Sequence, residues 1–474
     1  MMTQRLAGAR SLAVDDAAVR EPIARVRGTV LQPGDAEYDA GRRVRNGLID
    51  RRPTLIVRCA ETADVAAAVA FARDRDLVLS VWGGGHNVAG SAVNDGGMVI
   101  DLSAMRGVRV DPAARTVRVE GGATWGDVDP ATQEFGLATP GGNVSSTGVG
   151  GLTLGGGMGH LRRKYGLSID NLLAVEIVTA DGQVRTASAS ENPDLFWAVR
   201  GGGGNFGVVT AFEFRLHPVG PTVMFCAPVY ALEDGPALLP AWRDFMATAP
   251  EEISSIALIW SVPAVEAFPP ELHNKPVVIL PTLHCGPVEE GERQTRPVRE
   301  LATPVLDMSQ PMPYAAAQSG FDAFFPKGWL YYWKSLFLSG LDEPELATIL
   351  DYGADRPSPQ SMMAIWHQGG AMSRVGSEET AFGRRDAPFL LSFDTTWTDP
   401  SQTERAIAWT RAAWSAMHRF SSGQPYQNFV GFGEEKDALA RAAYGANYGR
   451  LAAIKARYDP TNLFRMNQNI QPSR

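Results

Sequence analysis

A histidine that directly follows three glycines is the first group in the chain whose position suggests chemistry. The segment reads Trp82-Gly83-Gly84-Gly85-His86-Asn87-Val88-Ala89-Gly90. Because glycine has no Cβ, the backbone before His86 can approach a bound molecule closely. The imidazole could then serve as a general base, a metal ligand or a nucleophile toward an electrophilic cofactor. No second histidine or carboxylate follows at ligand spacing, so no metal is expected. We favour a cofactor-facing histidine over a purely structural one.

The longest glycine-rich stretch reads GGNVSSTGVGGLTLGGGMGHLRRKYG and runs from Gly141 to Gly166. Flexible linkers are usually polar, whereas apolar residues such as Val149, Leu152 and Leu154 interrupt this stretch. Backbone N–H groups in consecutive turns form anion-binding concavities. We therefore interpret the stretch as folded backbone laid against a large flat ligand. A set of tight turns in an all-β region is the alternative.

A strand-like run over residues 389–397 places three polar side chains on one face. Side chains alternate along a strand, so Ser392, Asp394 and Thr396 lie on the same side of an otherwise apolar segment. Such a face either lines a cavity or meets water on a solvated edge strand. The alternation of side chains does not by itself distinguish a cavity wall from a solvated edge strand.

A third glycine cluster, at residues 202–207, formally matches the GxGxxG fingerprint of dinucleotide-binding proteins. That fingerprint requires a strand before the glycines and a helix after them. Here the flanking patterns predict a helix before and a strand after. The cluster is therefore not expected to form a Rossmann site.

The elements that must position these groups begin after residue 50, since residues 1–50 suggest a leader helix and a loop. Strand-like residues 53–60, a helical run starting at residue 61 and a strand ending near residue 85 predict a β–α–β unit with parallel strands. Residues 171–188 predict a β-hairpin, with its turn at residues 180–182.

The character of the sequence changes near residue 220, where the glycine clusters stop. Residues 221–425 alternate strand-like and helical runs, which predicts an α+β region with a sheet and helices on one face. A helix carrying Tyr444 and Tyr448 follows, and Asp459-Pro460 ends it. The closing residues 464–470 could return to the first domain as an extended chain, with Asn467 and Asn469 on one side.

Composition narrows the class of protein. The chain has 474 residues, enough for two or three domains, and its net charge of -8 disfavours nucleic-acid binding, which needs a basic face. Three widely spaced cysteines favour neither disulfides nor a zinc site. The N-terminus has no uninterrupted apolar run, so we expect no signal peptide, no membrane anchor and a cytoplasmic protein. Monomer and homodimer are not distinguished.

Several motifs together resemble the berberine-bridge-enzyme-like FAD-linked oxidases of the vanillyl-alcohol-oxidase and p-cresol-methylhydroxylase superfamily. They are WGGGHNVAG at 82–90, ATPGGNVSSTGVGGLTLGGGMGHLRRKYGLSIDNLL at 138–173, DLFWAVRGGGGNFGVVT at 194–210, YQNF at 426–429 and YGANYGRLAAIKARYDPTNLFRMNQNI at 444–470. The resemblance spans nearly the whole chain. It implies an α+β protein whose two-part FAD-binding domain, residues 1–220 and 426–474, encloses a central substrate domain, residues 221–425, with an antiparallel sheet flanked by helices.

The resemblance also implies how FAD is held. In this family the histidine of the GGGH motif is bonded covalently to the flavin 8α carbon, and here that residue is His86. Some members add a cysteinyl bond, but Val144 stands at the matching position, so we expect a single bond. The motifs imply cofactor contacts from Trp82, Gly83, Gly84, Gly85, His86, Asn87, Gly90, Gly141, Gly142, Val144, Thr147, Gly148, Gly151, Gly156, Gly157, His160, Val208, Val209, Tyr426, Asn428, Asn467 and Asn469.

Two of these positions depart from the family pattern. Trp82 stands where an arginine is common. His160 stands where a tryptophan or another large residue is common, so we expect it either to face the flavin or substrate or to lie at the surface.

The reaction implied by the resemblance is oxidation of a small organic substrate. A base takes a proton from a hydroxyl or amine while hydride passes to flavin N5, and O₂ then reoxidises the flavin. The family's base sits on the strand that matches 389–397, which makes Asp394 the candidate base, with Ser392 beside it and Tyr426 as a residue that assists deprotonation. Tyr331, Tyr332, Lys334 and His367 are weaker candidates.

Other functions remain open at this point. A dehydrogenase that uses an acceptor other than oxygen, or a non-redox flavin-binding protein, would carry the same motifs. Sugars, secondary alcohols, cyclic amines and polyketide-like phenols all occur as substrates among relatives, and the sequence does not choose between them.

Overall fold

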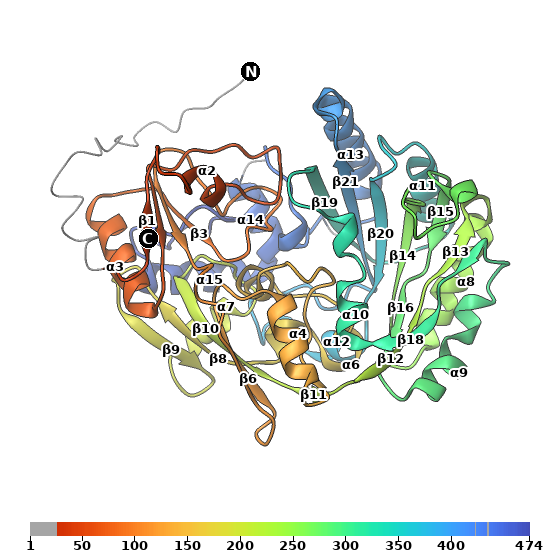
Figure 1. The fold of residues 1–474 in the computed structure, drawn as a ribbon, viewed down its shortest axis with the longest axis horizontal. Coiled ribbons are helices and arrows are strands. Elements are labelled where there is room, and N and C mark those ends of the chain that lie inside the picture. Colours follow the sequence, from red (N-terminus) through yellow and green to blue (C-terminus); the bar gives the residue numbers. More distant parts are fainter. Residues whose placement is uncertain (1–25, 422, 434–435) are drawn as a thin grey trace.

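The computed structural model describes residues 26–421, 423–433 and 436–474 and shows an α+β protein (Figure 1). The expected leader helix falls partly on residues 1–25, outside the described residues. Residues 26–50 form the short strand β1 (Thr29–Leu31), the single turn α2 (Tyr38–Gly41) and loop. In Figure 1 the elements up to β11, together with α14 and α15, occupy one half of the molecule. Those from β12 to α13 occupy the other half.

The first sheet contains the predicted β–α–β unit. Strand β2 (Leu55–Arg58), helix α3 (Thr62–Asp74) and strand β3 (Leu79–Trp82) follow one another, and strand β4 (Met98–Asp101) lies between the two strands and pairs in parallel with both. The parallel arrangement is thus as predicted. Because β3 ends at Trp82, the His86 loop leaves the carboxyl end of the sheet, where ligands of parallel sheets usually bind.

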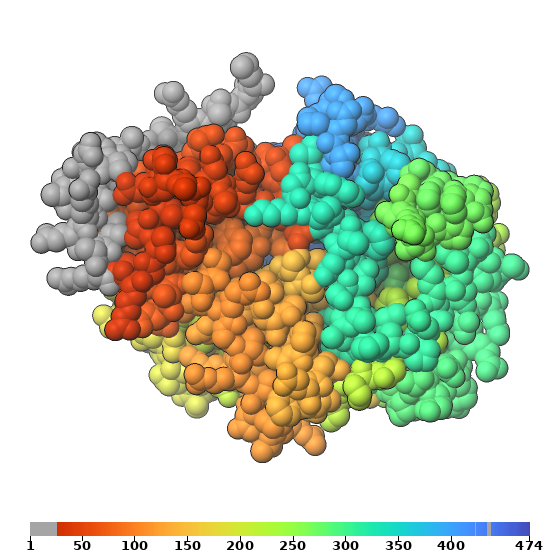
Figure 2. Space-filling view, viewed as in Figure 1, coloured from red at the N-terminus to blue at the C-terminus, as the bar shows by residue number. Residues whose placement is uncertain are grey.

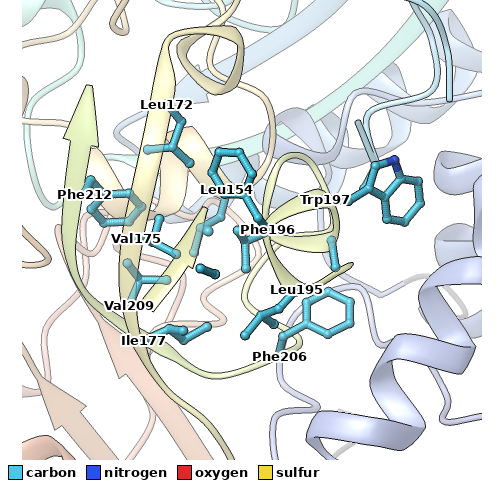
Figure 3. Packing of buried hydrophobic residues seen from close by; sticks show 14 of the residues in the cluster. Leu154, Leu172, Val175, Ile177, Leu195, Phe196, Trp197, Phe206, Val209 and Phe212 are labelled. Carbon is cyan, nitrogen blue, oxygen red and sulfur yellow. The ribbon is translucent and has the colours of Figure 1, made fainter. Parts of the chain in front are cut away.

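The second sheet is antiparallel, with strand order β5-β6-β10-β8-β9. Strands β8 and β9 form the predicted hairpin, and Gly182 supplies its turn with a φ of 80°. Val175 of β8 and Phe212 of β10 pack in one cluster with Leu195 and Phe196 of helix α7 (Pro193–Val199), as Figure 3 shows. The order of helix α7, glycine turn and strand β10 confirms that residues 202–207 are not a Rossmann fingerprint. The strands are β5 (Val108–Asp111), β6 (Thr116–Glu120), β8 (Leu172–Val178), β9 (Val184–Ser188) and β10 (Val208–Arg215), and a separate pair is formed by β7 (Leu137–Ala138) and β11 (His217–Pro218).

A ten-stranded antiparallel sheet forms the other half of the molecule. Helices α8 (Gly235–Thr248), α11 (Glu343–Ala354) and α13 (Thr403–His418) cover one of its faces and share a hydrophobic core with it. The other face is turned toward the first half, and Figure 2 shows the two halves meeting along a broad seam. The strands are β12 (Thr222–Cys226), β13 (Pro228–Ala231), β14 (Ile253–Ser261), β15 (Pro276–Ile279), β16 (Thr282–His284), β17 (Leu306–Asp307), β18 (Gln310–Pro313), β19 (Leu330–Leu338), β20 (Met362–His367) and β21 (Phe389–Trp397).

Shorter helices connect these layers. Helix α10 of the second half contacts α4 of the first, where Gln318 Nε2 donates a hydrogen bond of 3.3 Å to Asp129 Oδ2. The remaining helices are α4 (Trp125–Gln133), α5 (Val149–Leu154), α6 (Arg162–Tyr165), α9 (Val288–Arg299), α10 (Tyr314–Ser319) and α12 (Ala371–Arg374). Single 3₁₀ turns lie at η1 (Ser168–Asp170), η2 (Leu232–Asp234), η3 (Pro270–Leu272), η4 (Asp322–Phe324), η5 (Pro400–Gln402), η6 (Gln427–Phe429) and η7 (Gly445–Asn447).

The C-terminal segment returns to the first half of the chain. The single helix predicted there is two helices, α14 (Lys436–Tyr444) and α15 (Tyr448–Tyr458), because Gly445 turns the chain with a φ of 51°. Lys455 Nζ is fully buried and donates hydrogen bonds to Asp459 Oδ2 at 2.6 Å and to the carbonyl oxygens of Asn205 and Phe464. This cluster ties α15 and the chain terminus to the 202–207 glycine turn.

Replacing Lys455 by methionine should therefore destabilise the fold strongly. The change leaves the Asp459 carboxylate buried without its cation, and breaking a buried pair in this way costs about 3–5 kcal/mol. Chemical denaturation would measure the loss. Arg457→Met on the same helix is the control, because it removes only an ion pair whose arginine is 65% exposed, and should cost under about 1 kcal/mol. Equal losses in the two variants would contradict the role given to Lys455.

We propose domain boundaries from this arrangement. Every strand of the ten-stranded sheet lies within residues 222–397, and the strands of the other sheets lie within residues 29–218. The segment after residue 425 packs on the first half. The proposed division is thus 1–220 with 426–474 as one domain, and 221–425 as the other.

Candidate active site

A large cavity lies between the two halves of the molecule. It encloses about 1960 Å³, including the part open to solvent, and its walls come from the His86 loop, the 141–166 stretch, the ten-stranded sheet and the C-terminal segment. The wall from the first half is built largely of glycine: Gly83, Gly84, Gly85, Gly121, Gly142, Gly148, Gly150, Gly151, Gly155, Gly203, Gly204 and Gly207.

The glycines serve both the cavity and the packing of the chain on itself. Gly151 lines the cavity, and a Cβ added there would meet nothing within 4 Å. By contrast, a Cβ on Gly84 would stand 2.5 Å from the backbone of Gly148, and one on Gly148 would stand 2.7 Å from Gly84. These two positions need glycine because the His86 loop and the 141–166 stretch touch backbone to backbone. The stretch also contains helix α5, so it is not a set of tight turns.

His86 lies in the cavity wall with both ring nitrogens near hydroxyl groups. Nε2 is 3.1 Å from Ser146 Oγ, and Nδ1 is 3.3 Å from Thr147 Oγ1. Burial, followed by the positive charge of Arg45, lowers the pKa of His86 well below its usual value. The imidazole is therefore neutral near pH 7 and keeps a lone pair available, as a nucleophile must.

The structure brings most of the predicted cofactor contacts to the cavity wall, but not all of them. Those that line it are Gly83, Gly84, Gly85, His86, Asn87, Gly142, Val144, Thr147, Gly148, Gly151, Val208, Val209, Asn428 and Asn467. Those that do not are Trp82, Gly90, Gly141, Gly156, Gly157, His160, Tyr426 and Asn469.

The four glycines away from the wall have other reasons to lack a side chain. A Cβ on Gly90 would meet Ile49 at 2.8 Å, and one on Gly141 would meet the Trp125 ring at 2.5 Å. Gly156 and Gly157 both have positive φ, 124° and 83°. Glycine at these positions makes room for neighbouring side chains or allows the chain to turn. A sequence pattern alone does not distinguish these roles from contact with a ligand.

The two departures from the family pattern are both away from the cavity wall. The Trp82 indole lies so close to Gly85 that a Cβ there would stand 2.7 Å from its Nε1. His160 is 2% exposed, and its ring lies 6.4 Å from the ring of Phe321, which does line the cavity. Burial lowers the pKa of His160 to about 3. His160 is thus neither a surface residue nor a direct contact of the cavity.

Local backbone shape explains why Tyr426 and Asn469 miss the wall. Residues 427–429 form the 3₁₀ turn η6, so successive residues and not alternate ones face the cavity. The Tyr426 hydroxyl instead accepts hydrogen bonds from the N–H groups of Gly157 and Met158 and from Asn428 Nδ2. The chain also bends at residues 466–468 and is not extended there, so the alternation predicted for Asn467 and Asn469 is wrong.

The opposite wall presents a carboxyl group on an apolar sheet. Asp394 lies on β21, which runs between β19 and β20 and is buried along its whole length, so the solvated-edge alternative is wrong. Its neighbours across the strands, Trp333 and Met362, also line the cavity. Asp394 is 5% exposed, and its Oδ1 has no hydrogen-bond partner. Burial raises the pKa of Asp394 to about 7, opposed by a hydrogen bond from Ser392.

The other predicted catalytic residues lie behind the wall. Ser392 is fully buried, and its Oγ accepts from Trp366 Nε1 at 3.4 Å, so it contacts Asp394 without lining the cavity. Lys334 Nζ lies 4.0 Å from the centre of the Trp414 ring, and His367 packs edge-on against Trp242. Both therefore face the helices. Tyr331 and Tyr332 are also buried away from the wall.

Sequence reasoning missed several residues of the cavity. Arg45 comes from the loop after α2, and only a cluster of basic residues in a segment of little apolar content marked that loop. The wall of the second half adds large apolar side chains that sequence patterns do not separate from an ordinary core: Ile256, Leu258, Phe321, Phe325, Trp333, Met362 and Trp366. Phe429 of the C-terminal segment is a further one. The C-terminal segment adds Gln427, Met466 and Gln468 beside the expected asparagines.

Comparisons with known proteins agree with this geometry. One family model, described as FAD binding domain, matches residues 53–188, and another, described as Berberine and berberine like, matches residues 426–471. (R)-6-hydroxynicotine oxidase of Paenarthrobacter nicotinovorans is 32% identical over 457 residues, which cover 94% of this chain and 97% of that protein. The chain belongs to the berberine-bridge-enzyme-like family of FAD-linked oxidoreductases.

Other members of the family match over similar lengths. An FAD-linked oxidoreductase of Dictyostelium discoideum is 30% identical over 459 residues, which cover 96% of this chain and 97% of that protein. The crystal structure of 6-hydroxy-D-nicotine oxidase from Arthrobacter nicotinovorans superposes with a TM-score of 0.84 at 31% identity, covering 94% of this chain and 98% of that one. Chitooligosaccharide oxidase gives a TM-score of 0.85 at 23% identity, covering 96% and 100%, and shows the shared fold. The predicted family and α+β fold are confirmed.

FAD is the cofactor of this FAD-linked oxidoreductase, and the residues of the cavity fit it. The glycine wall leaves space where side chains would stand, as at Gly151, and the neutral His86 lines the same cavity. Val144 lies at the cavity wall, and the three cysteines are buried elsewhere. Within the described part of the chain, no helix combines the length and apolar character needed to cross a membrane.

Proposed function

We propose that this protein is an FAD-dependent oxidase that removes hydride from a small, largely apolar organic substrate, with FAD attached covalently through His86 and reoxidised by O₂. One observation carries the proposal: the Asp394 carboxyl lies buried in an apolar wall of the same cavity whose other wall is made of glycine and His86. A titratable group on one side and a cofactor cradle on the other are what substrate oxidation needs.

Asp394 is the proposed base. A catalytic base works best when its pKa lies near the working pH, and burial raises the pKa of Asp394 to about 7. The unpartnered Oδ1 is free to accept a proton from a substrate hydroxyl or amine, while Ser392 steadies the carboxyl from behind. When bound, FAD supplies the two-electron acceptor for the hydride. The protein positions the substrate and takes the proton.

His86 is the proposed anchor of FAD. Its neutral ring in the cavity wall supports a bond to an electron-poor carbon. Val144 at the position of the second, cysteinyl attachment supports a single bond. The remaining cavity-lining glycines, Thr147, Asn428 and Asn467 are proposed to hold the cofactor without covalent contact.

The apolar wall favours one part of the substrate range. Asp394 is the only ionisable residue among the described residues that the ten-stranded sheet and its connections contribute to the cavity wall. The others are aliphatic or aromatic. Apart from Asp394 Oδ1 and Trp333 Nε1, which have no partner, this wall offers few hydrogen bonds to the many hydroxyl groups of a sugar, and leaving those groups unpaired is costly. An aromatic or alicyclic substrate with one reacting hydroxyl or amine fits better. A relative is named for oxidation of 6-hydroxynicotine, in agreement with this choice.

Anaerobic reduction of the bound flavin tests the proposal. We expect aromatic alcohols, phenols or cyclic amines to bleach the yellow colour without oxygen, sugars to leave it unchanged, and admission of air to restore it. Bleaching by sugars alone would contradict the substrate class. Bleached flavin that persists in air would identify a dehydrogenase, and failure to bleach with any donor would favour a non-redox flavoprotein.

A further inference from the structure

Arg45 is a largely buried cation beside His86, and the reaction proposed above does not use it. Its Nη2 donates a hydrogen bond to Ser146 Oγ, and the same oxygen lies 3.1 Å from His86 Nε2. The backbone N–H of Arg45 also donates to the carbonyl of Gly85, at 2.9 Å. Arg45 thus holds the loop that carries His86 and reaches the imidazole ring through one hydroxyl.

The charge of Arg45 is poorly compensated. Its Nε and Nη1 are buried without hydrogen-bond partners, and burial lowers the pKa of Arg45, opposed by the nearby Tyr331 hydroxyl and Asp322 carboxylate. The Asp322 oxygens are themselves used by Ser145, through its backbone N–H at 2.7 Å and its hydroxyl. A buried cation without a full partner destabilises a fold. Groups held in such a state are concentrated at functional sites.

The hydrogen-bond directions define the protonation of His86. A guanidinium only donates, so Ser146 Oγ accepts from Arg45 and its own proton is free for His86 Nε2. The single ring proton then sits on Nδ1 and points to Thr147 Oγ1, 3.3 Å away. A second ring proton would remove the Ser146 bond to Nε2 and place positive charge beside Arg45. The same arrangement therefore selects the neutral ring, its tautomer and its orientation.

The other charged groups near His86 do not favour a second proton on its ring. Lys327 is also positive, and burial followed by the charges of Arg43 and Arg45 lowers its pKa. The carboxylate of Asp322 acts on Arg45, and Asp394 belongs to the opposite wall. Burial and Arg45 are the causes that lower the pKa of His86.

We propose that Arg45, acting through the hydroxyl of Ser146, holds the His86 imidazole neutral and in one orientation so that it can form the covalent bond to FAD. This inference rests on the proposed attachment at His86, and it makes Arg45 a positioning residue. Attachment would join Nε2, once its lone pair gives up the hydrogen bond from the Ser146 hydroxyl, to the 8α carbon. The imidazole N–H proton, together with a methyl C–H proton and its electron pair, passes to the flavin. Molecular oxygen then accepts two electrons and two protons and leaves as hydrogen peroxide.

The test measures how fast FAD becomes acid-stable in the full chain. Protein made without flavin is mixed with FAD between pH 5 and pH 9, and the flavin retained after acid precipitation is followed with time. Removing the positive charge of Arg45 should raise the pKa of His86, so the midpoint of the pH profile should move upward in Arg45→Met. Attachment on the acidic side should then slow by up to about tenfold, and attachment above pH 8 should match the wild type.

Three further variants separate charge from structure. Arg45→Lys should keep the wild-type pH profile because the cation remains. Ser146→Ala should slow attachment at every pH without the full shift, because it loses the orientation but keeps the charge. Arg43→Met is the matched control, since Arg43 is an exposed arginine two residues away, and it should behave as wild type.

The outcomes distinguish this inference from the proposed function. Acid-labile flavin in the wild type at every pH would end the proposed attachment and this inference with it. Acid-stable flavin in the wild type with the same pH profile in Arg45→Met would overturn the role of Arg45 alone, as would slowing that is equal at all pH values. Where flavin-free protein does not fold, the ratio of acid-stable to total flavin in protein purified with its cofactor decides the matter. Arg45→Met must then fall below both Arg45→Lys and the wild type.

Discussion

Asp394→Asn should slow reduction of the bound flavin by about 10²-fold or more, because it removes the group that accepts the substrate proton. The side chain keeps nearly the same shape, so the apolar wall around it is not disturbed. Stopped-flow absorbance under anaerobic conditions, with a substrate that bleaches the wild type, measures the reduction step directly. A loss of only a few fold would show that Asp394 is not the base.

The pH dependence provides a second measure of the same group. Asp394 accepts a proton only when ionised, and burial raises its pKa to about 7. The rate of flavin reduction in the wild type should therefore rise as the pH increases through about 7 and then level off. Asp394→Asn should lose this rise. Asp386→Asn is the matched control, because Asp386 is an exposed aspartate a few residues before the same strand, and it should keep both the rate and the profile.

Most of the fold could be predicted from regular patterns in the sequence. Strand β21 has the bounds predicted from its alternation, Phe389–Trp397, because both of its faces are buried and the polar side chains mark one of them. The hairpin around Gly182 follows from a local turn rule. The C-terminal helix was predicted as one element and is two, since helix-forming residues stand on both sides of Gly445 while its positive φ ends the first helix.

The site was predictable where the motif is local and less so where distant segments meet. His86 and the three glycines before it lie at the cavity, because the missing side chains let this backbone approach a ligand closely. Gly141 also lies in a glycine-rich segment, yet it lacks a side chain because the ring of Trp125 fills that space. Which atoms fill the space beside a glycine depends on the tertiary fold. The position of Arg45 at the cavity could not be predicted for the same reason. Its hydrogen bond to Ser146 joins two segments that lie far apart in the sequence, and no repeating pattern links them.

His86→Ala should abolish acid-stable flavin completely. The bond requires a ring nitrogen with a free lone pair, and alanine offers none. Wild-type protein should stay yellow after precipitation with acid, whereas the variant should release all of its flavin to the supernatant. Absorbance of pellet and supernatant is sufficient to measure both. The variant should still bind FAD without a covalent bond, because the glycine wall and the C-terminal segment that line the cavity are unchanged.

The control for this prediction is His418→Ala, an exposed histidine at the end of α13, which should retain all of its acid-stable flavin. Acid-stable flavin that survives in His86→Ala would place the bond on another residue. Among the described residues, the three cysteines are buried away from the cavity wall, so they offer no ready alternative. Because a covalent bond raises the flavin potential, noncovalently bound FAD in His86→Ala should also be reduced more slowly by substrate than in the wild type. Slower reduction in His86→Ala together with normal binding of FAD would show that the bond tunes the cofactor as well as retaining it.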